Sequence, residues 1–201
     1  MRHWRPDPAA YPVQGVRIGA DDGTVDWIAI RAVGAAFAYV DASVSAFSRD
    51  AQFIRNLEEA RAAQLQVGAL HRYDPCQPAD RQAANFVTLV PRDPGLLPPA
   101  IELAKLADDC PAHVSDGAVE SELMTFLNQV EIHTGKPVML KISPAFERRY
   151  HVAASFDRPL WLDRDRLQPR YGGRPWTLWT ANAALSSEAG DRPLRWLVAQ
   201  P

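Results

Sequence analysis

Short apolar runs recur along the chain, and most of them are separated by segments that can form helices. They lie at residues 13–18, 36–40, 66–71, 99–103, 138–142, 159–162, 176–180 and 194–199. Continuous apolar runs of this length are typical of strands that are buried on both faces of a sheet. The pattern therefore predicts eight strands.

Segments with helical periodicity lie between the first five runs. They cover residues 27–33, 51–63, 79–89 and 119–132. In the second segment, Phe53, Leu57 and Ala60 recur at helical spacing, and charged residues occupy the opposite face. Asp50 stands where this helix would have its N-cap, and Gly135 follows the fourth segment as a C-terminal stop.

The alternation of strands and helices predicts parallel strands joined by crossover helices. A complete eightfold barrel usually needs about 250 residues, whereas this chain has 201. The shortfall lies after residue 158, where the last three runs leave no room for full helices. We therefore predict an α/β fold, a trimmed TIM-like (β/α)5(β)3 barrel with helices after the first five strands and short loops between the last three. Residues 1–201 would form one domain, with residues 1–12 as an N-terminal extension.

Composition excludes several classes of protein. Hydrophobic residues make up 47% of the chain, which excludes intrinsic disorder. The formal net charge is -2 and the basic clusters are short, so we expect no nucleic-acid partner. No apolar run approaches the roughly 18 residues of a membrane span. The first residues lack the apolar centre of a signal peptide, and we expect neither a metal nor another cofactor.

An ordered series of motifs extends over nearly the whole chain. It consists of GVRIG at 15–19, GTVDW at 23–27, LQVGALH at 65–71, QAANF at 82–86, LPPAIELA at 97–104, PLW at 159–161 and WTLW at 176–179. No single motif is diagnostic, but the ordered set resembles glycoside hydrolase family 25, the muramidase-type lysozymes. The resemblance implies the same trimmed barrel. It also implies cleavage of the β-1,4 bond between N-acetylmuramic acid and N-acetylglucosamine in peptidoglycan.

The resemblance also locates the family's four catalytic acids, and this chain has replaced three of them. Glycoside hydrolysis needs one carboxylic acid to protonate the leaving oxygen and a second carboxylate to assist the cationic transition state. The family's opening Asp corresponds to Arg17, its proton-donating Glu to Ala104, and its last-strand Asp to Arg195. The fourth-strand Asp corresponds to Glu102, the one family carboxylate that survives.

Glu102 has two interpretations. It is a general acid if it retains a proton, and a structural ion-pair partner if arginines surround it. We expect Arg17 and Arg195 to flank it on neighbouring strands, which would lower the pKa of Glu102. We therefore favour the ion pair.

Further side chains are expected at the carboxyl ends of the strands, where barrel enzymes have their sites. These binding candidates are Asp41, His71, Lys141, Asp163, Trp161, Trp179 and Asn182. One option is a pair of Asp41 with Lys141 across the mouth, and Asp41 or Asp163 is expected to compensate the excess positive charge of Arg17 and Arg195. No second ligand has metal spacing with His71, so a hydrogen-bonded structural histidine is favoured there. The tryptophans offer either sugar-stacking faces or core packing.

Three functions remain open at this stage. The first is a lysozyme-like protein with little or no hydrolysis that retains binding of peptidoglycan or another glycan. The second is an active glycosidase in which Glu102 works with a displaced acid, namely Asp41, Asp163 or Asp165. The third is an interaction module whose charged mouth binds a protein partner.

Cys76 and Cys110 follow the third and fourth strands, so both fall on loops at one end of the barrel. Free buried thiols and a disulfide are both compatible with this spacing. The family resemblance favours a disulfide, because some bacterial members carry cysteines in these loops. A disulfide would indicate a periplasmic or extracellular protein.

Overall fold

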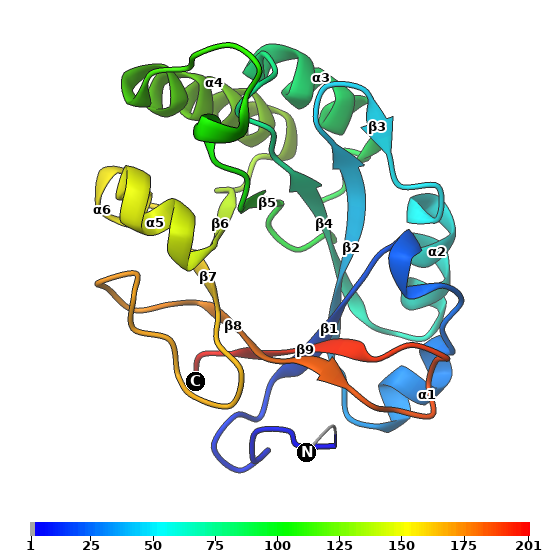
Figure 1. Cartoon of the computed structure of the whole chain (residues 1–201). Coiled ribbons are helices and arrows are strands. Elements are labelled where there is room, and N and C mark those ends of the chain that lie inside the picture. The colour runs from blue at the N-terminus through cyan, green and yellow to red at the C-terminus, as the bar shows by residue number, and fades with distance from the viewer. Residues whose placement is uncertain (1–2) are drawn as a thin grey trace.

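The computed structural model describes residues 3–201, and eight of its strands close into a barrel (Figure 1). The barrel strands are β1 (Gln14–Ile18), β2 (Phe37–Val44), β4 (Gln66–Arg72), β5 (Ala100–Leu103), β6 (Met139–Ile142), β7 (Leu160–Asp163), β8 (Leu178–Leu185) and β9 (Leu194–Ala199). Strand β1 pairs with both β2 and β9, which closes the sheet. Neighbouring barrel strands are parallel except at β9, which is antiparallel to β8 and β1. The predicted barrel is confirmed.

Helices follow the first five barrel strands and surround that part of the barrel (Figure 1). They are α1 (Trp27–Ala32), α2 (Phe53–Ala62), α3 (Ala79–Leu89), α4 (Asp116–Thr134), α5 (Pro144–Tyr150) and α6 (Val152–Ser155). Neither of the connections between the last three strands contains a helix, as predicted, although residues 164–177 form a long connection rather than a short loop. The order of elements is therefore (β/α)5 followed by three strands.

Some element boundaries differ from the sequence pattern for local reasons. The N-cap position of α2 is Gln52, so the expected cap at Asp50 is wrong. The carboxylate of Asp50 instead accepts hydrogen bonds from the backbone N–H groups of Gln52 and Ala20. Helix α4 starts earlier than predicted because Ser115 caps it, and it ends at Gly135 in the left-handed conformation, as expected. A two-residue strand, β3 (Ser48–Arg49), extends the sheet beside β2 and was not predicted.

Large side chains fill the interior of the barrel. This inner cluster comprises Phe37, Tyr39, Leu70, Ala100, Met139, Trp161, Leu178 and Leu197. The ring of Tyr39 occupies space that a side chain on Gly68 would need, because a Cβ atom there would lie 2.4 Å from the ring. A second, larger cluster fills the layer between the barrel and its outer cover. The interior is thus a packed core, and space for a ligand is left only at an end.

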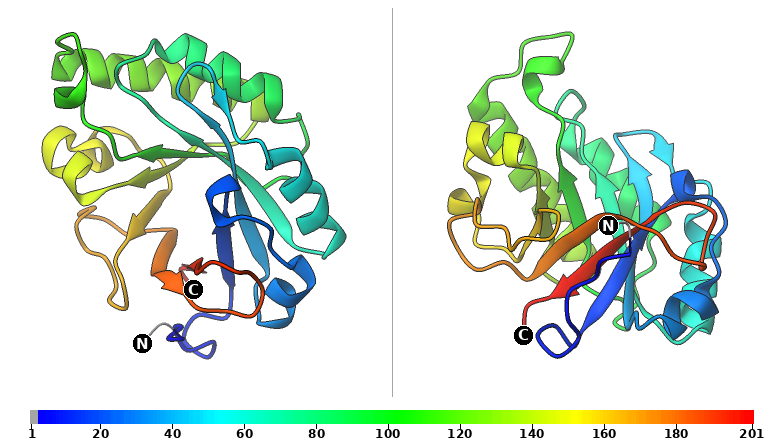
Figure 2. Two further views of the ribbon diagram at one scale, coloured as in Figure 1. Left: turned by 45° about the vertical axis from the view of Figure 1, so that its right-hand side comes forward. Right: turned by 60° about the horizontal axis from the view of Figure 1, so that its bottom comes forward.

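The N-terminal segment covers strands that have no helix of their own. Both views of Figure 2 place it beside the C-terminal strand. The ring of Tyr11 contacts those of Trp176 and Trp179, with centroids 6.3 Å and 5.7 Å away. Asn182 of β8 donates a hydrogen bond to the carbonyl of Trp4. Across residues 3–201, no helix combines the length and the apolar character that a membrane span requires.

Candidate functional site at the barrel mouth

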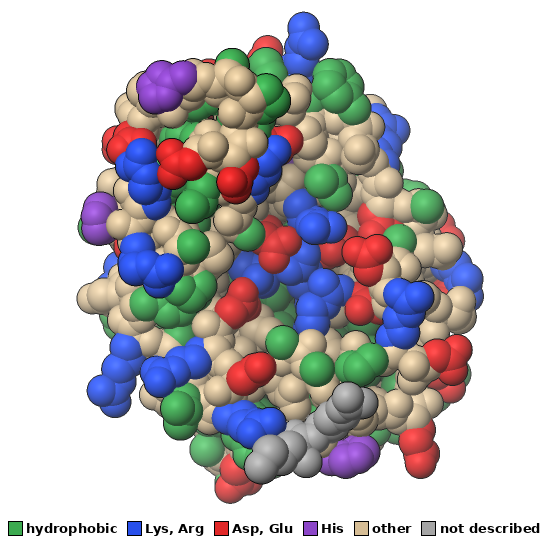
Figure 3. Space-filling view, viewed as in Figure 1, with side chains coloured by type: hydrophobic (Ala, Val, Ile, Leu, Met, Phe, Trp, Pro, Cys, Tyr) green, Lys and Arg blue, Asp and Glu red, His purple; other side chains and the backbone are tan. Residues whose placement is uncertain are grey.

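The carboxyl ends of the parallel strands and the start of β9 surround a cavity of about 510 Å³, here called the mouth. Its lining includes Arg17, Glu102, Lys141, Asp163, Thr180 and Arg195. Figure 3 shows acidic and basic side chains gathered at the centre of this face. The chain therefore places opposite charges together in one partly enclosed site.

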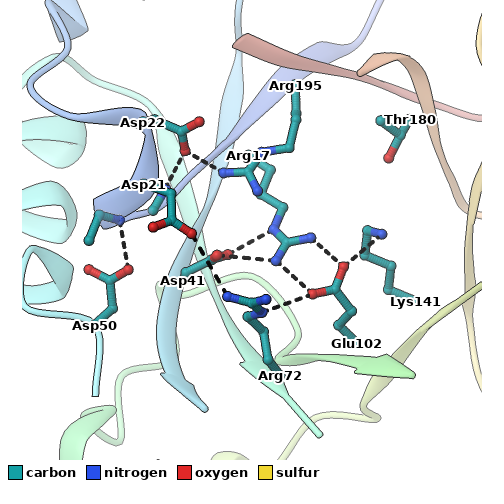
Figure 4. A network of polar contacts seen from close by, with 12 residues as sticks. Arg17, Asp21, Asp22, Asp41, Asp50, Arg72, Glu102, Lys141, Thr180 and Arg195 are labelled. Carbon is teal, nitrogen blue, oxygen red and sulfur yellow. Dashed lines mark hydrogen bonds and ion pairs between the residues drawn. The ribbon is translucent and has the colours of Figure 1, made fainter. Parts of the chain in front are cut away.

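Arg17 of β1 lies at the centre of the mouth between two carboxylates (Figure 4). Its Nε donates to Oδ1 of Asp41 at 2.8 Å, and its two terminal nitrogens reach the oxygens of Glu102 at 2.5 Å and 2.8 Å. A Cβ atom at Gly19 would lie 2.7 Å from Oδ2 of Asp41, so the glycine leaves room for this carboxylate. Burial lowers the pKa of Arg17, but the charges of Asp41 and Glu102 outweigh burial and raise it above its ordinary value. Arg17 thus remains charged in this pair.

Glu102 of β5 accepts contacts from three cationic side chains. Besides Arg17, Nζ of Lys141 lies 3.0 Å from its Oε1, and Nε of Arg72 lies 3.5 Å from its Oε2. Burial alone would raise the pKa of Glu102, but the hydrogen bonds and charges of Arg17 and Lys141 outweigh burial and hold it well below its usual range. This carboxyl group is therefore ionised, as the ion-pair interpretation expects.

Lys141 and Arg195 have partners that the sequence did not predict. Lys141 pairs with Asp163 of β7 as well as with Glu102, so the option of a pair with Asp41 is wrong. Arg195 lies beside Arg17 in register but pairs with Asp22, which follows β1. Arg195 therefore does not flank Glu102, and Lys141 and Arg72 take that place. Asp22 carried no signal, because the closure of the barrel brings it to Arg195. Arg72 follows His71 on β4 and lies in register with Glu102 on the adjacent strand, so the alternation of side chains along β4 was the signal that could have found it.

Ala104 lies just beyond the end of β5 and is exposed. Its methyl group offers no proton and no hydrogen bond. The position that the resemblance assigns to the proton donor therefore holds no acid in this chain.

His71 lies on the opposite side of the barrel wall from the mouth. Its Nδ1 is 2.8 Å from Oγ of Ser43 and its Nε2 is 3.2 Å from Oε1 of Gln82, and its ring stacks on Phe126 of α4. Burial lowers the pKa of His71 to about 4, and the hydrogen bond with Gln82 offsets this only in part. Its expected place at the mouth is wrong, because side chains alternate along a strand and Leu70 takes the inward position.

Three other binding candidates are used in packing. Trp161 lies within the barrel core, and its Nε1 donates to Oγ1 of Thr180 at 2.8 Å. Trp179 is buried under Tyr11 and donates to the carbonyl of Arg164. Asn182 holds the N-terminal segment. Neither tryptophan offers a free face to a sugar, so the core alternative holds for both.

Cys76 and Cys110 form a disulfide in the structure, with their Cα atoms 5.2 Å apart. Within the described part of the chain, one set of potential metal ligands lies together, namely Asp74 with the two cysteine sulfurs. The disulfide engages both sulfurs, and Asp74 is paired with Lys105 at 2.8 Å. This set therefore provides no thiolate for a metal.

Residues 18–183 match the model of glycosyl hydrolases family 25. The chain belongs to this family. It is 24% identical over 181 residues to the uncharacterized protein YegX of Escherichia coli (strain K12), a stretch that covers 86% of this chain and 64% of that relative. The chain thus spans less than two thirds of that relative's length.

Solved structures of the family share the fold. The family 25 glycosyl hydrolase from Bacillus anthracis superposes with a TM-score of 0.87 and 25% sequence identity, over 99% of this chain and 93% of the other. The bacterial lysozyme from Streptomyces coelicolor superposes with a TM-score of 0.82 and 19% identity, over 94% and 92% of the two chains. The resemblance to family 25 stated from the motifs is confirmed, and the chain has the lysozyme-like fold of these structures.

Proposed function

We propose that this family 25 barrel binds peptidoglycan or a related glycan without hydrolysing it. The observation that carries the proposal is the guanidinium of Arg17, bound to both Asp41 and Glu102 at the centre of the mouth. An arginine side chain keeps its proton under all physiological conditions and cannot act as an acid or a base.

The surviving carboxylate is poorly suited to proton donation. A general acid in glycoside hydrolysis needs a raised pKa, so that it still holds a proton at the operating pH. Glu102 has the opposite environment, with a lowered pKa and contacts from Arg17 and Lys141. Ala104 supplies no acid in its place. The chemical step therefore lacks its proton donor.

Two features favour retained glycan binding. The mouth remains open, with about 510 Å³ of space, and it is lined by hydrogen-bonding side chains. It also lies at the carboxyl ends of the barrel strands, where barrel enzymes have their sites. Binding requires only complementary polar groups around a cavity, whereas hydrolysis requires an acid in a particular protonation state.

The test combines two measurements on the same preparation. Release of soluble muropeptides from purified peptidoglycan reports hydrolysis, and co-sedimentation with insoluble peptidoglycan reports binding. We expect co-sedimentation without release for the parent protein and for Glu102→Gln. Arg55→Gln is the matched surface control, because among residues 3–201 Arg55 forms its ion pair with Glu59 alone, on the exposed face of α2.

Two outcomes would contradict the proposal. Release by the parent protein that Glu102→Gln abolishes would show that Glu102 is a working acid, and Asp41, Asp163 or Asp165 would become its partner. If neither release nor co-sedimentation is observed, the protein does not bind peptidoglycan and the proposed function is wrong.

A further inference from the structure

A second hollow lies on the outside of the barrel wall. It is a groove of about 520 Å³, here called the outer groove, between the turn that joins β2 to β3 and one face of α3. Strand β3 and helix α3 lie side by side in Figure 1, and Arg81, Asn85 and Thr88 of α3 line the groove at helical spacing. No residue is shared with the lining of the mouth, so the outer groove is a separate surface.

The turn between β2 and β3 is fastened to α3 by Asn85. Nδ2 of this buried side chain donates to the carbonyls of Ser45 and Ser48, at 3.2 Å and 2.9 Å. Its Oδ1 accepts a hydrogen bond of 3.0 Å from Nε of Arg49. The N–H of Ser45 also donates to the carbonyl of Arg72 on β4. The turn is therefore ordered before any ligand arrives, which lowers the entropy cost of binding.

Phe47 stands in this fastened turn with 70% of its surface exposed. The residue before it, Ala46, is buried and anchors the turn. An exposed aromatic ring on an ordered backbone offers a large apolar contact at low entropy cost. The outer groove thus has an apolar contact surface at its edge.

The charged side chains of the outer groove are two arginines, and none of the described residues that line it is acidic. Arg49 uses its Nε on Asn85, which leaves its two terminal nitrogens without a partner among residues 3–201. Arg81 is exposed, and its guanidinium forms no hydrogen bond or ion pair with that part of the chain. Like charges repel each other, and an anion in the groove would be attracted to both. The outer groove therefore favours an anionic ligand.

We infer that the outer groove binds an acidic segment of a protein partner, with a carboxylate held by Arg49 and Arg81 and a neighbouring apolar side chain packed on Phe47. Guanidinium groups suit a carboxylate because their planar donors match its two oxygens. Arginine and aromatic residues are enriched at protein interfaces, and acidic residues and lysine are depleted, as in this lining. A hollow fits the side chains of a peptide better than the flat surface of a membrane. The inference goes beyond the proposed function, which concerns the mouth.

The test uses a synthetic peptide as the probe. The peptide acetyl-Asp-Leu-Asp-Leu-Asp-amide carries carboxylates beside apolar side chains, and its neutral counterpart has Asn in place of each Asp. NMR chemical-shift titration measures both affinities and locates the contact. We expect the acidic peptide to bind about tenfold or more tightly than the neutral one, with shifts centred on the outer groove. Added salt should weaken its binding.

Two variants assign the contact. Arg81→Gln and Phe47→Ala change exposed side chains, and Arg81→Gln removes no ion pair within residues 3–201, so both should fold. We expect each to weaken binding of the acidic peptide about three- to tenfold. Arg55→Gln is the matched control, because Arg55 is an exposed arginine outside the groove, and it should bind like the parent.

Absence of binding of the acidic peptide, equal affinity for both peptides, shifts centred elsewhere, or unchanged binding by both variants would overturn the inference. A membrane surface is the rival partner. Co-sedimentation with phosphatidylglycerol vesicles but not with phosphatidylcholine vesicles, lost in Phe47→Ala and without peptide binding, would assign the groove to a membrane and overturn the inference. Co-sedimentation with peptidoglycan should be the same for Arg81→Gln as for the parent, so the proposed function is tested separately.

Discussion

Two buried polar networks lie on opposite sides of the same barrel wall. The inner one, at the mouth, joins Arg17 to Asp41 and Glu102. The outer one, between the barrel and its helices, joins His71 to Ser43 and Gln82. The inner network is ionic and borders a cavity, whereas the outer network is neutral and enclosed by aromatic rings.

The comparison shows that partners, more than burial, decide which protonation state a group adopts. Burial disfavours the charged form of both Glu102 and His71. Glu102 stays ionised because cationic side chains contact it, and its pKa falls. His71 has only neutral partners in its hydrogen bonds, so it stays uncharged until the pH approaches 4. Arg17, together with Lys141, therefore keeps Glu102 in its ionised form.

The largest effect is expected from removing the centre of the inner network. Arg17→Met keeps much of the side-chain volume but leaves Asp41 and Glu102 without their shared cation. Loss of one partner from a buried ion pair costs about 3–5 kcal/mol of unfolding free energy. Urea denaturation measures this loss of unfolding free energy, with Arg55→Met on the exposed face of α2 as the control. A loss below about 1 kcal/mol would mean that solvent in the mouth already screens these charges.

The second largest loss of stability is expected from breaking the disulfide between the loops beside the outer network. Gln82, which contacts His71, also donates to the carbonyl of Asp74 in the loop that carries Cys76. The Cys76–Cys110 disulfide closes a loop with a sequence separation of 34. Its reduction should lower the unfolding free energy by about 3–4 kcal/mol in the chain-entropy model. Denaturation with and without reductant measures the loss, and Cys76→Ser with Cys110→Ser should become insensitive to reductant.

The outer network should also make stability depend on pH. The pKa of His71 is about 4 in the folded protein, below the ordinary 6.5 of the unfolded chain, so the unfolded state takes up a proton first as the pH falls. Stability is complete above about pH 6.5 and decreases by about 3 kcal/mol as the pH falls to about 4. Denaturation midpoints at several pH values measure this slope, and His71→Gln should flatten it. A slope that persists in His71→Gln would assign it to other groups.

A smaller effect is expected at the other partner of Arg17. Glu102→Gln retains the shape of the side chain and removes its charge, while Arg17 keeps Asp41. We expect a loss of about 1–3 kcal/mol at neutral pH. Because the pKa of Glu102 is lowered by folding, its contribution is present above the unfolded value and disappears as the pH falls through the folded one. The difference between parent and variant should therefore shrink in acid. A stabilising effect of Glu102→Gln would instead indicate a strained general acid.

The smallest effect is expected from removing an ion pair on the exposed surface. Arg55 and Glu59 form an ion pair on the surface of α2, with about half of each side chain exposed. Arg55→Gln should change the unfolding free energy by less than about 0.5 kcal/mol, because water screens such pairs. A loss comparable with that of Glu102→Gln would show that burial at the mouth adds nothing to an ion pair in this protein.

The fold was predictable because its signals are local and repeated. Each strand is an apolar run, each of the four predicted helices has its own periodicity or stop signal, and the order of elements restricts the topology to a barrel. The limits of several elements nevertheless differ: β2 and β8 extend four and five residues beyond the predicted runs, which end at residues 40 and 180. Ser115 lengthened α4 at its N-terminus, and Asp50 used its carboxylate on two backbone groups instead of serving as the cap of α2.

The sequence by itself determined which side chains are available at the mouth, because residue identity alone excludes an acid at Arg17, Ala104 and Arg195 and leaves one at Glu102. That these are the four positions of the family's acids is a prediction from the resemblance. Only the tertiary structure decided the partners. Closure of the barrel brings Asp22 to Arg195, and the alternation of side chains sends His71 outward. Ion pairs and cavities depend on distances of a few ångströms between residues far apart in the chain, and no sequence pattern encodes such distances.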